Sequence, residues 1–236
     1  MASRPLHFIW LADGSGSMRV DGKIQALNHA IREAIPHMRS VARENPHASV
    51  YVNAIQFADE AHWMGEKLTP VSEFRWQDIE AGGVTALGEA LTMVGDALQP
   101  PLMTERALPP VIALVTDGLP TDDFHAGLNH LLSKPWGRQA VRIVVAIGED
   151  SASNEAQEIF RAFIANEALR PFQANNPEVL VEAIRWVSTA VLKSVSSPVS
   201  QIADGSQAGV EQGQEAPTSA SPEVTLGPEE DEVDVW

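Results

Sequence analysis

The chain has 236 residues, 44% of them apolar, which is enough to bury one sizeable core and predicts one domain plus a tail. Its formal net charge of -16 disfavours nucleic acids and anionic membrane surfaces as partners, and its lack of cysteine excludes disulfides, zinc–thiolate sites and cysteine catalysis. No apolar run approaches the ~18 residues of a membrane span, and the short apolar stretch near the start is predicted to be a strand rather than a signal peptide, so we expect a soluble, cytoplasmic protein.

The first half of the chain alternates apolar runs with segments of helical period. Residues 6–11, which are apolar except for His7, are predicted to form a buried strand. Apolar residues spaced by three and four positions then predict one face of a helix: Ile24, Leu27, Ile31, Ile35 and Met38. Residues 49–57 are predicted to form a second strand and residues 61–64 a short third one. A second helix is indicated by Leu87, Leu91, Val94 and Leu98.

The second half continues in the same way. Residues 111–115 and 141–147 are apolar, β-branched runs typical of strands buried on both faces, and residues 169–172 predict a short strand. Helices are predicted from three further sets: Phe124, Leu128 and Leu131; Ala156, Ile159, Phe160 and Phe163; and Leu180, Ile184, Val187 and Val191. Strands separated by helix-length segments predict an α/β fold with a mostly parallel sheet.

The composition changes near Ser194, which divides the chain into a folded domain, residues 1–195, and a tail, residues 196–236. The tail has nine acidic residues, no lysine or arginine, and few large apolar side chains. Such a segment cannot bury enough surface to offset its ordering entropy, so we expect disorder. The tail has three candidate roles. It is a solvated segment without a partner, or a linear motif that binds a basic partner, or a segment in which one carboxylate occupies the metal site that the protein's own folded domain is predicted to contain.

Oxygen-bearing side chains gather at the ends of the predicted strands. Asp13, Ser15 and Ser17 alternate in a turn that follows the first strand, and Asp117 follows the strand at 111–115. Thr85 stands just before the second predicted helix. Because ligands of such sheets bind beyond the carboxyl ends of the strands, these five residues are expected to meet at one edge. Hard oxygen donors of this kind favour Mg²⁺, Mn²⁺ or Ca²⁺.

Three stretches resemble the von Willebrand factor A (vWA) domain family and its metal-ion-dependent adhesion site. They are Asp13-Gly14-Ser15-Gly16-Ser17-Met18, Gly82-Gly83-Val84-Thr85-Ala86-Leu87 and Thr116-Asp117-Gly118. The resemblance covers roughly residues 6–191. It implies a doubly wound sheet with helices on both faces and a divalent cation, usually Mg²⁺. It also implies that Ser15, Ser17 and Thr85 coordinate the ion, while Asp13 and Asp117 act directly or through water.

The expected function follows from the charge of this site. Of the five predicted ligands only Asp13 and Asp117 are charged, so they would not fully neutralise a bound Mg²⁺. The ion would also keep one coordination position open. A carboxylate from another protein can complete the coordination. The sequence therefore indicates a non-enzymatic, metal-dependent protein-interaction module, a scaffold or adaptor.

Two acidic residues after the third stretch, Asp122 and Asp123, are expected to cap the next helix.

Within the vWA family, the chain looks like the TerY-type bacterial proteins of the tellurium-resistance and stress group. The stretches that suggest this are residues 82–91 and 116–122. The resemblance implies a serine/threonine kinase or a PP2C-like phosphatase as partner. The acidic tail departs from the family pattern and leaves the partner assignment open.

Enzymatic alternatives are less well supported by the residues. Gly83 and Gly88 have the spacing of a P-loop, but Glu89 replaces the lysine that would hold phosphate. Gly14 and Gly16 begin a dinucleotide fingerprint, but Arg19 stands where the third glycine belongs. A metal-dependent phosphohydrolase is the stronger rival, since a bound ion can polarise phosphate and activate water.

Overall fold

The computed structural model describes residues 3–65 and 69–196 of the chain. The strands of its sheet are β1 (Arg4–Asp13), β2 (Ala48–Phe57), β3 (Ala61–Trp63), β4 (Thr69–Pro70), β5 (Val111–Thr116), β6 (Val141–Ile147) and β7 (Phe172–Ala174). The α-helices are α1 (Lys23–Glu44), α2 (Leu87–Ala97), α3 (Phe124–Ser133), α4 (Pro135–Gln139), α5 (Asn154–Ile164), α6 (Pro177–Trp186) and α7 (Leu192–Ser196). Three short turns of other helix types are η1 (Gly16–Gly22), η2 (Asp150–Ala152) and η3 (Val187–Val191).

The strands lie in the order β3-β2-β1-β5-β6-β7, and β4 pairs with β2 beside β3. The four pairs from β2 to β7 are parallel, whereas β3 and β4 pair antiparallel with β2. The chain moves from β1 to β2 on one side and later to β5 on the other. The direction of winding therefore reverses at β1, and the gap between β1 and β5 is the switch point where such sheets bind ligands.

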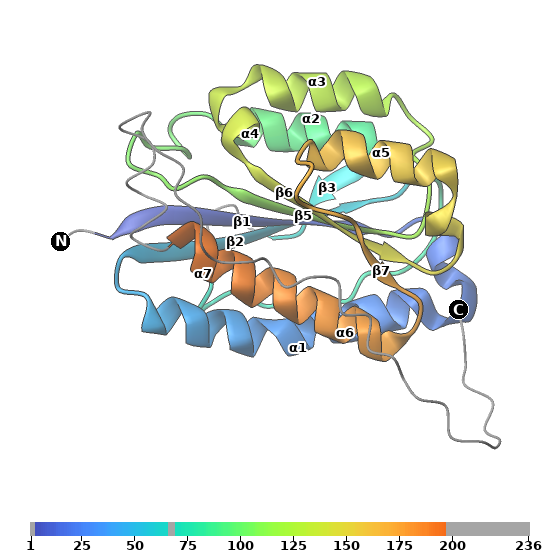
Figure 1. Ribbon diagram of the computed structural model, residues 1–236, viewed down its shortest axis with the longest axis horizontal. Coiled ribbons are helices and arrows are strands. Elements are labelled where there is room, and N and C mark those ends of the chain that lie inside the picture. Colours follow the sequence, from blue (N-terminus) through green and yellow to red (C-terminus); the bar gives the residue numbers. More distant parts are fainter. Residues whose placement is uncertain (1–2, 66–68, 197–236) are drawn as a thin grey trace.

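Helices cover both faces of the sheet. Figure 1 shows α2, α3, α4 and α5 on one face and α1, α6 and α7 on the other. Successive side chains of β1 point to opposite faces of the sheet, so this strand contributes to the cores on both faces. Phe8 and Trp10 pack with α1 and α6. Ile9 and Leu11 pack with α2, α3 and α5 on the other face. All four side chains are fully buried. An unbroken apolar run is what a strand covered on both faces requires.

The predicted α/β fold is confirmed: the sheet is mostly parallel and doubly wound, with helices on both faces. Some elements differ in detail. The strand predicted at residues 169–172 begins three residues later, as β7. The short elements β4 and α4 were not predicted, because two and five residues show no period. The pattern from Leu180 to Val191 was predicted as one helix, but its second half winds as the π-helical η3.

The end of the folded part lies in α7. Ser196, the first residue of the predicted tail, is the last residue of this helix and is buried. Asn45, after α1, donates a hydrogen bond from its side chain to the Ser196 hydroxyl at 2.6 Å. The remainder of the predicted tail, residues 197–236, lies outside the described residues. Within the described ranges, no helix combines the length and apolar character that crossing a bilayer requires.

Candidate metal centre

The predicted metal-binding residues lie on three loops at the carboxyl edge of the sheet. Asp13 is the last residue of β1, and Asp117 directly follows the neighbouring strand β5. Ser15 and Ser17 lie where the chain turns from β1 into η1. Thr85 comes two residues before α2. The two acidic residues therefore flank the switch point of the sheet.

Hydrogen bonds join four of the five side chains into one cluster. The hydroxyls of Ser15 and Ser17 are 3.0 Å apart, and the Ser17 hydroxyl donates to Asp117 Oδ1 at 2.7 Å. The Ser15 amide donates to Asp13 Oδ1 at 2.8 Å. Asp13, Ser15 and Asp117 are buried, whereas Ser17 is exposed. The cluster is thus reached from solvent on the Ser17 side.

The Asp13 carboxyl is the most deeply buried polar group of the cluster. Its Oδ2 accepts a hydrogen bond from the Thr116 hydroxyl at 2.5 Å. Burial raises the pKa of Asp13 from 3.8 to about 6; the hydrogen bonds from Thr116 and Ser15 lower it, and the charge of Asp117 raises it. A carboxylate that is costly to ionise in isolation gains most from a cation beside it. This is a property expected of a metal ligand.

Thr85 is brought to the cluster by backbone contacts. The Gly82 amide donates to the Gly14 carbonyl at 2.8 Å, and the Gly16 amide donates to the Gly83 carbonyl at 3.1 Å. Gly83 has φ +74°, and a Cβ there would collide with the Asp59 carboxylate, so glycine is required. Among the described residues, no hydrogen bond links the Thr85 hydroxyl to the other four predicted ligands.

The third loop is bonded to Thr85 as well. The Thr85 amide donates to the Thr121 hydroxyl, and the Thr121 amide donates to the Thr85 carbonyl, both at 2.9 Å. Asp123 caps α3 by accepting from the Ala126 amide, as predicted. The prediction for Asp122 was wrong: its carboxylate caps α2, accepting from the amides of the first turn. All three motif loops are therefore tied to one another.

The long segment that leads to Thr85 has little regular structure, and α1 holds it in place. Asn28 on α1 accepts from Trp76 Nε1 at 2.9 Å and from the Ile79 amide at 3.0 Å. The Asn28 side chain also donates to the Ile79 carbonyl at 2.9 Å. Further back along the segment, Arg39 donates to the Val71 carbonyl at 3.0 Å. Asn28 is buried with all these bonds made, so it acts as the anchor of the segment.

Lys23 is a part of the site that sequence analysis missed. Its side chain is only 5% exposed, and its Nζ donates to Asp117 Oδ2 at 3.0 Å. The exposed Asp150 lies 3.9 Å from the same Nζ. A cation at the start of a helix is opposed by the helix dipole, but a lysine is ordinarily exposed there, so nothing in the sequence signals that Lys23 contacts Asp117.

The set of donors fits a hard divalent cation. Two carboxylates and three hydroxyls offer only oxygen ligands, which Mg²⁺ prefers. In the described part of the chain, no group of three or more histidine, cysteine or acidic side chains is arranged to hold a metal. The Lys23 ammonium lies 3.0 Å from Asp117 Oδ2, so this carboxylate is already paired with a cation. The residues present are therefore compatible with Mg²⁺, and Asp13, Ser15, Ser17, Thr85 and Asp117 are the ones that would hold it.

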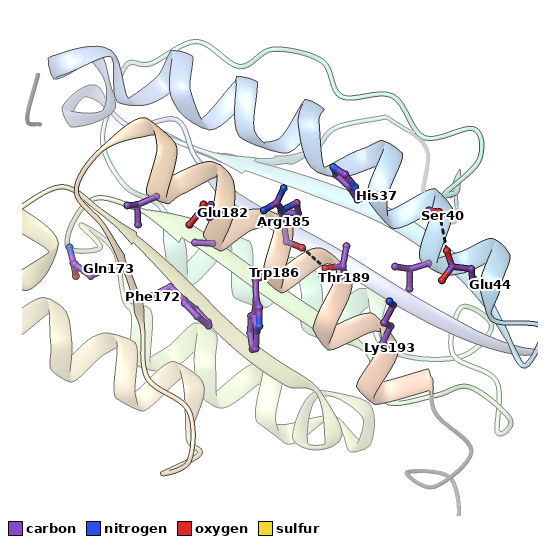
Figure 2. Close-up of a pocket in the computed structure, with 13 residues that line it drawn as sticks. His37, Ser40, Glu44, Phe172, Gln173, Glu182, Arg185, Trp186, Thr189 and Lys193 are labelled. Atoms are coloured by element: carbon purple, nitrogen blue, oxygen red, sulfur yellow. Dashed lines mark hydrogen bonds between the residues drawn. The ribbon is translucent and has the colours of Figure 1, made fainter. Parts of the chain in front are cut away.

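A separate groove of about 830 Å³ lies between α1 and α6. Figure 2 shows Trp186 and Phe172 on one side of it and His37 and Glu44 on the other. His37 follows Lys23 by fourteen residues on α1, about 21 Å along the helix axis. The groove contains none of the five predicted ligands and has no part in the metal centre.

Comparison with solved structures places this fold among known proteins. The vWF domain of the type V pili tip protein Mfa5 from Porphyromonas gingivalis matches with a TM-score of 0.63 at 9% identity, over 83% of this chain and 97% of that one. The ArnB paralog VWA2 from Sulfolobus acidocaldarius matches with a TM-score of 0.55 at 19% identity, over 78% and 45%. A von Willebrand factor type A protein from Catenulispora acidiphila matches with a TM-score of 0.56 at 20% identity, over 79% and 42%.

The chain therefore has the fold of a von Willebrand factor A domain. It spans less than half the length of the Sulfolobus and Catenulispora proteins. No protein-family profile and no curated protein sequence matches it. At these identities the likeness concerns the fold alone.

Proposed function

We propose that this protein is a metal-dependent protein-interaction module, a scaffold or adaptor that captures a partner's carboxylate through a bound Mg²⁺, or Mn²⁺ or Ca²⁺ in its place. One observation carries the proposal. Asp13, Ser15, Ser17 and Asp117 form a single hydrogen-bonded cluster at the switch point of the sheet, open to solvent at Ser17. The loop of Thr85 is bonded to the same turn.

The charge of the cluster supports binding to an acidic group. Asp13 and Asp117 are its only carboxylates among the five ligands, and Lys23 already balances Asp117. A divalent ion held there keeps net positive charge facing solvent. Mg²⁺ also prefers six oxygen ligands, so a partner's carboxylate gains both a charge partner and a coordination position. An acidic side chain on another protein is therefore the expected ligand.

We further propose that the chain is not an enzyme. Phosphate transfer needs cationic groups free to face the reacting phosphate. The two basic side chains of the site region are already engaged: Lys23 by Asp117 at 3.0 Å, and Arg19 by the Ala81 carbonyl at 2.7 Å. A phosphohydrolase would release phosphate from a generic ester in Mg²⁺. We expect no such release from this protein.

The biological setting proposed here is a bacterial, cytoplasmic stress or phosphosignalling system with a serine/threonine kinase or a PP2C-like phosphatase as partner. Its support is the resemblance of residues 82–91 and 116–122 to TerY-type proteins. Of the residues within these stretches, Asp122 and Thr121 have a structural role, since they tie the third loop to α2 and Thr85. The partner's identity rests on the resemblance.

Affinity capture from native cell extract tests the proposed function. The full chain and the isosteric variant Asp13→Asn serve as baits, each in Mg²⁺ and in excess EDTA. We expect a partner that is retained by the wild type in Mg²⁺ and lost in EDTA and with Asp13→Asn, because each change removes the metal bridge. Neutralising one exposed acidic residue of that partner should abolish capture. Partners that ignore both EDTA and the substitution would contradict the proposal.

A further inference from the structure

Lys23 places a positive charge inside the proposed metal centre. Its ammonium contacts Asp117 Oδ2, while the other oxygen of the same carboxylate accepts from Ser17. Asp117 is 1% exposed and the lysine side chain 5% exposed, so solvent screens the pair little. The remaining acidic neighbour, Asp150, is exposed at 87% and 3.9 Å away. The charge of Lys23 is thus directed at a predicted metal ligand.

The backbone before α1 is shaped to deliver this side chain. Val20 is extended, and the next two residues have positive φ, 54° at Asp21 and 71° at Gly22. A non-glycine residue in the left-handed region is uncommon and costs conformational energy. This turn at Asp21 and Gly22 lets α1 begin at Lys23, immediately beside the hydrogen-bonded cluster of predicted metal ligands.

We infer that Lys23 is an internal counter-ion of the metal centre: it neutralises Asp117 when no metal is bound and competes with the divalent cation for that carboxylate. The inference rests on the proposed metal site. A buried carboxylate left without a cation is costly, and the ammonium removes that cost in the metal-free protein. The same ammonium repels an incoming Mg²⁺. Lys23 therefore lowers metal affinity and keeps the ligands ordered between binding events.

Metal titration of charge variants tests the inference. Calorimetry of the full chain with Mg²⁺ alone would compare the wild type with Lys23→Met, which removes the charge, and Lys23→Gln, which can still donate to Asp117. Lys23→Arg retains the charge. Lys134→Met removes a lysine between α3 and α4 and controls for net charge. We expect the two uncharged variants to bind Mg²⁺ about 10-fold or more tightly, and the Arg and Lys134 variants to stay near wild type.

Thermal unfolding gives a second readout that does not depend on partner binding. In EDTA, Lys23→Met should melt below the wild type, and saturating Mg²⁺ should raise its melting temperature by more than it raises that of the wild type. Unchanged or weaker Mg²⁺ binding by both uncharged variants would overturn the inference while leaving the metal site intact. If the two uncharged variants bound Mg²⁺ tightly and the wild type did not bind it, the inference about Lys23 would be supported. The same result would overturn the proposed function, because the native chain would not hold the metal. No uptake by any variant would overturn both.

Discussion

Replacing Asp13 with asparagine is expected to weaken Mg²⁺ binding by about 100-fold or more, because it removes one of the two carboxylates among the five proposed ligands. The amide is isosteric, so it still accepts from the Ser15 amide and can hydrogen-bond with the Thr116 hydroxyl. The loop should therefore keep its conformation. Isothermal titration with Mg²⁺ measures the affinity, and circular dichroism checks the fold.

The same variant should be more stable than the wild type when no metal is present. Burial raises the folded-state pKa of Asp13 to about 6, above its ordinary value of 3.8. The stability this group contributes is therefore fully present below pH 4 and is lost as the pH rises through 6. In EDTA at pH 8, Asp13→Asn should exceed the wild type in unfolding free energy by about 3 kcal/mol. The difference should vanish near pH 4.

Asp150→Asn is the matched control for this comparison. It removes an acidic charge from the same edge, but Asp150 is exposed and is not a predicted ligand. Its Mg²⁺ affinity should stay within about threefold of the wild type, since exposed charges are well screened. Wild-type affinity in Asp13→Asn, or an equal loss in both variants, would contradict the assignment of Asp13.

Asn28→Ala is expected to lower the free energy of unfolding by about 3 kcal/mol, because it leaves three buried groups without partners. These are Trp76 Nε1 and the amide and carbonyl of Ile79. The segment they belong to leads directly to Thr85. Urea denaturation measures the stability, and Mg²⁺ titration of the folded variant should show weaker binding, since the Thr85 loop loses its anchor.

Gln25→Ala provides the control on the same helix. Gln25 is exposed on α1 and close in sequence to Asn28. Its replacement should change the unfolding free energy by no more than about 0.5 kcal/mol. If Asn28→Ala behaved like Gln25→Ala in both measurements, Asn28 would not be the anchor of the segment.

Much of the fold could be predicted because the spacing of apolar residues along the chain indicates which side chains are buried. The run at residues 8–12 has no polar interruption, since alternate side chains of β1 enter different cores. The helix face that contains Leu27 and Ile31 packs on the sheet as its spacing indicates. Short elements were harder to predict. The five residues of α4, starting at Pro135, are too few to show a helical period, and β7, which is three residues long, was predicted with different bounds.

The candidate site was predictable only in part. Asp13 and Asp117 follow strands that are easy to recognise, so the sheet edge could be predicted from their positions. Lys23 and Asn28 escaped, because their partners lie far away in sequence: Lys23 contacts Asp117, 94 residues on. Such contacts depend on how helices and loops pack. Sequence pattern alone carries no record of them.

A crystal structure of the full chain grown in Mn²⁺ would show whether the proposed metal centre binds an ion, because the anomalous scattering of Mn²⁺ locates the ion without reference to the protein. We expect one strong peak beside Ser15, Ser17 and Thr85, with Asp13 and Asp117 facing it directly or through water. A chain that shows no peak at this edge of the sheet, or binds the ion elsewhere, would contradict the metal centre and the function built on it.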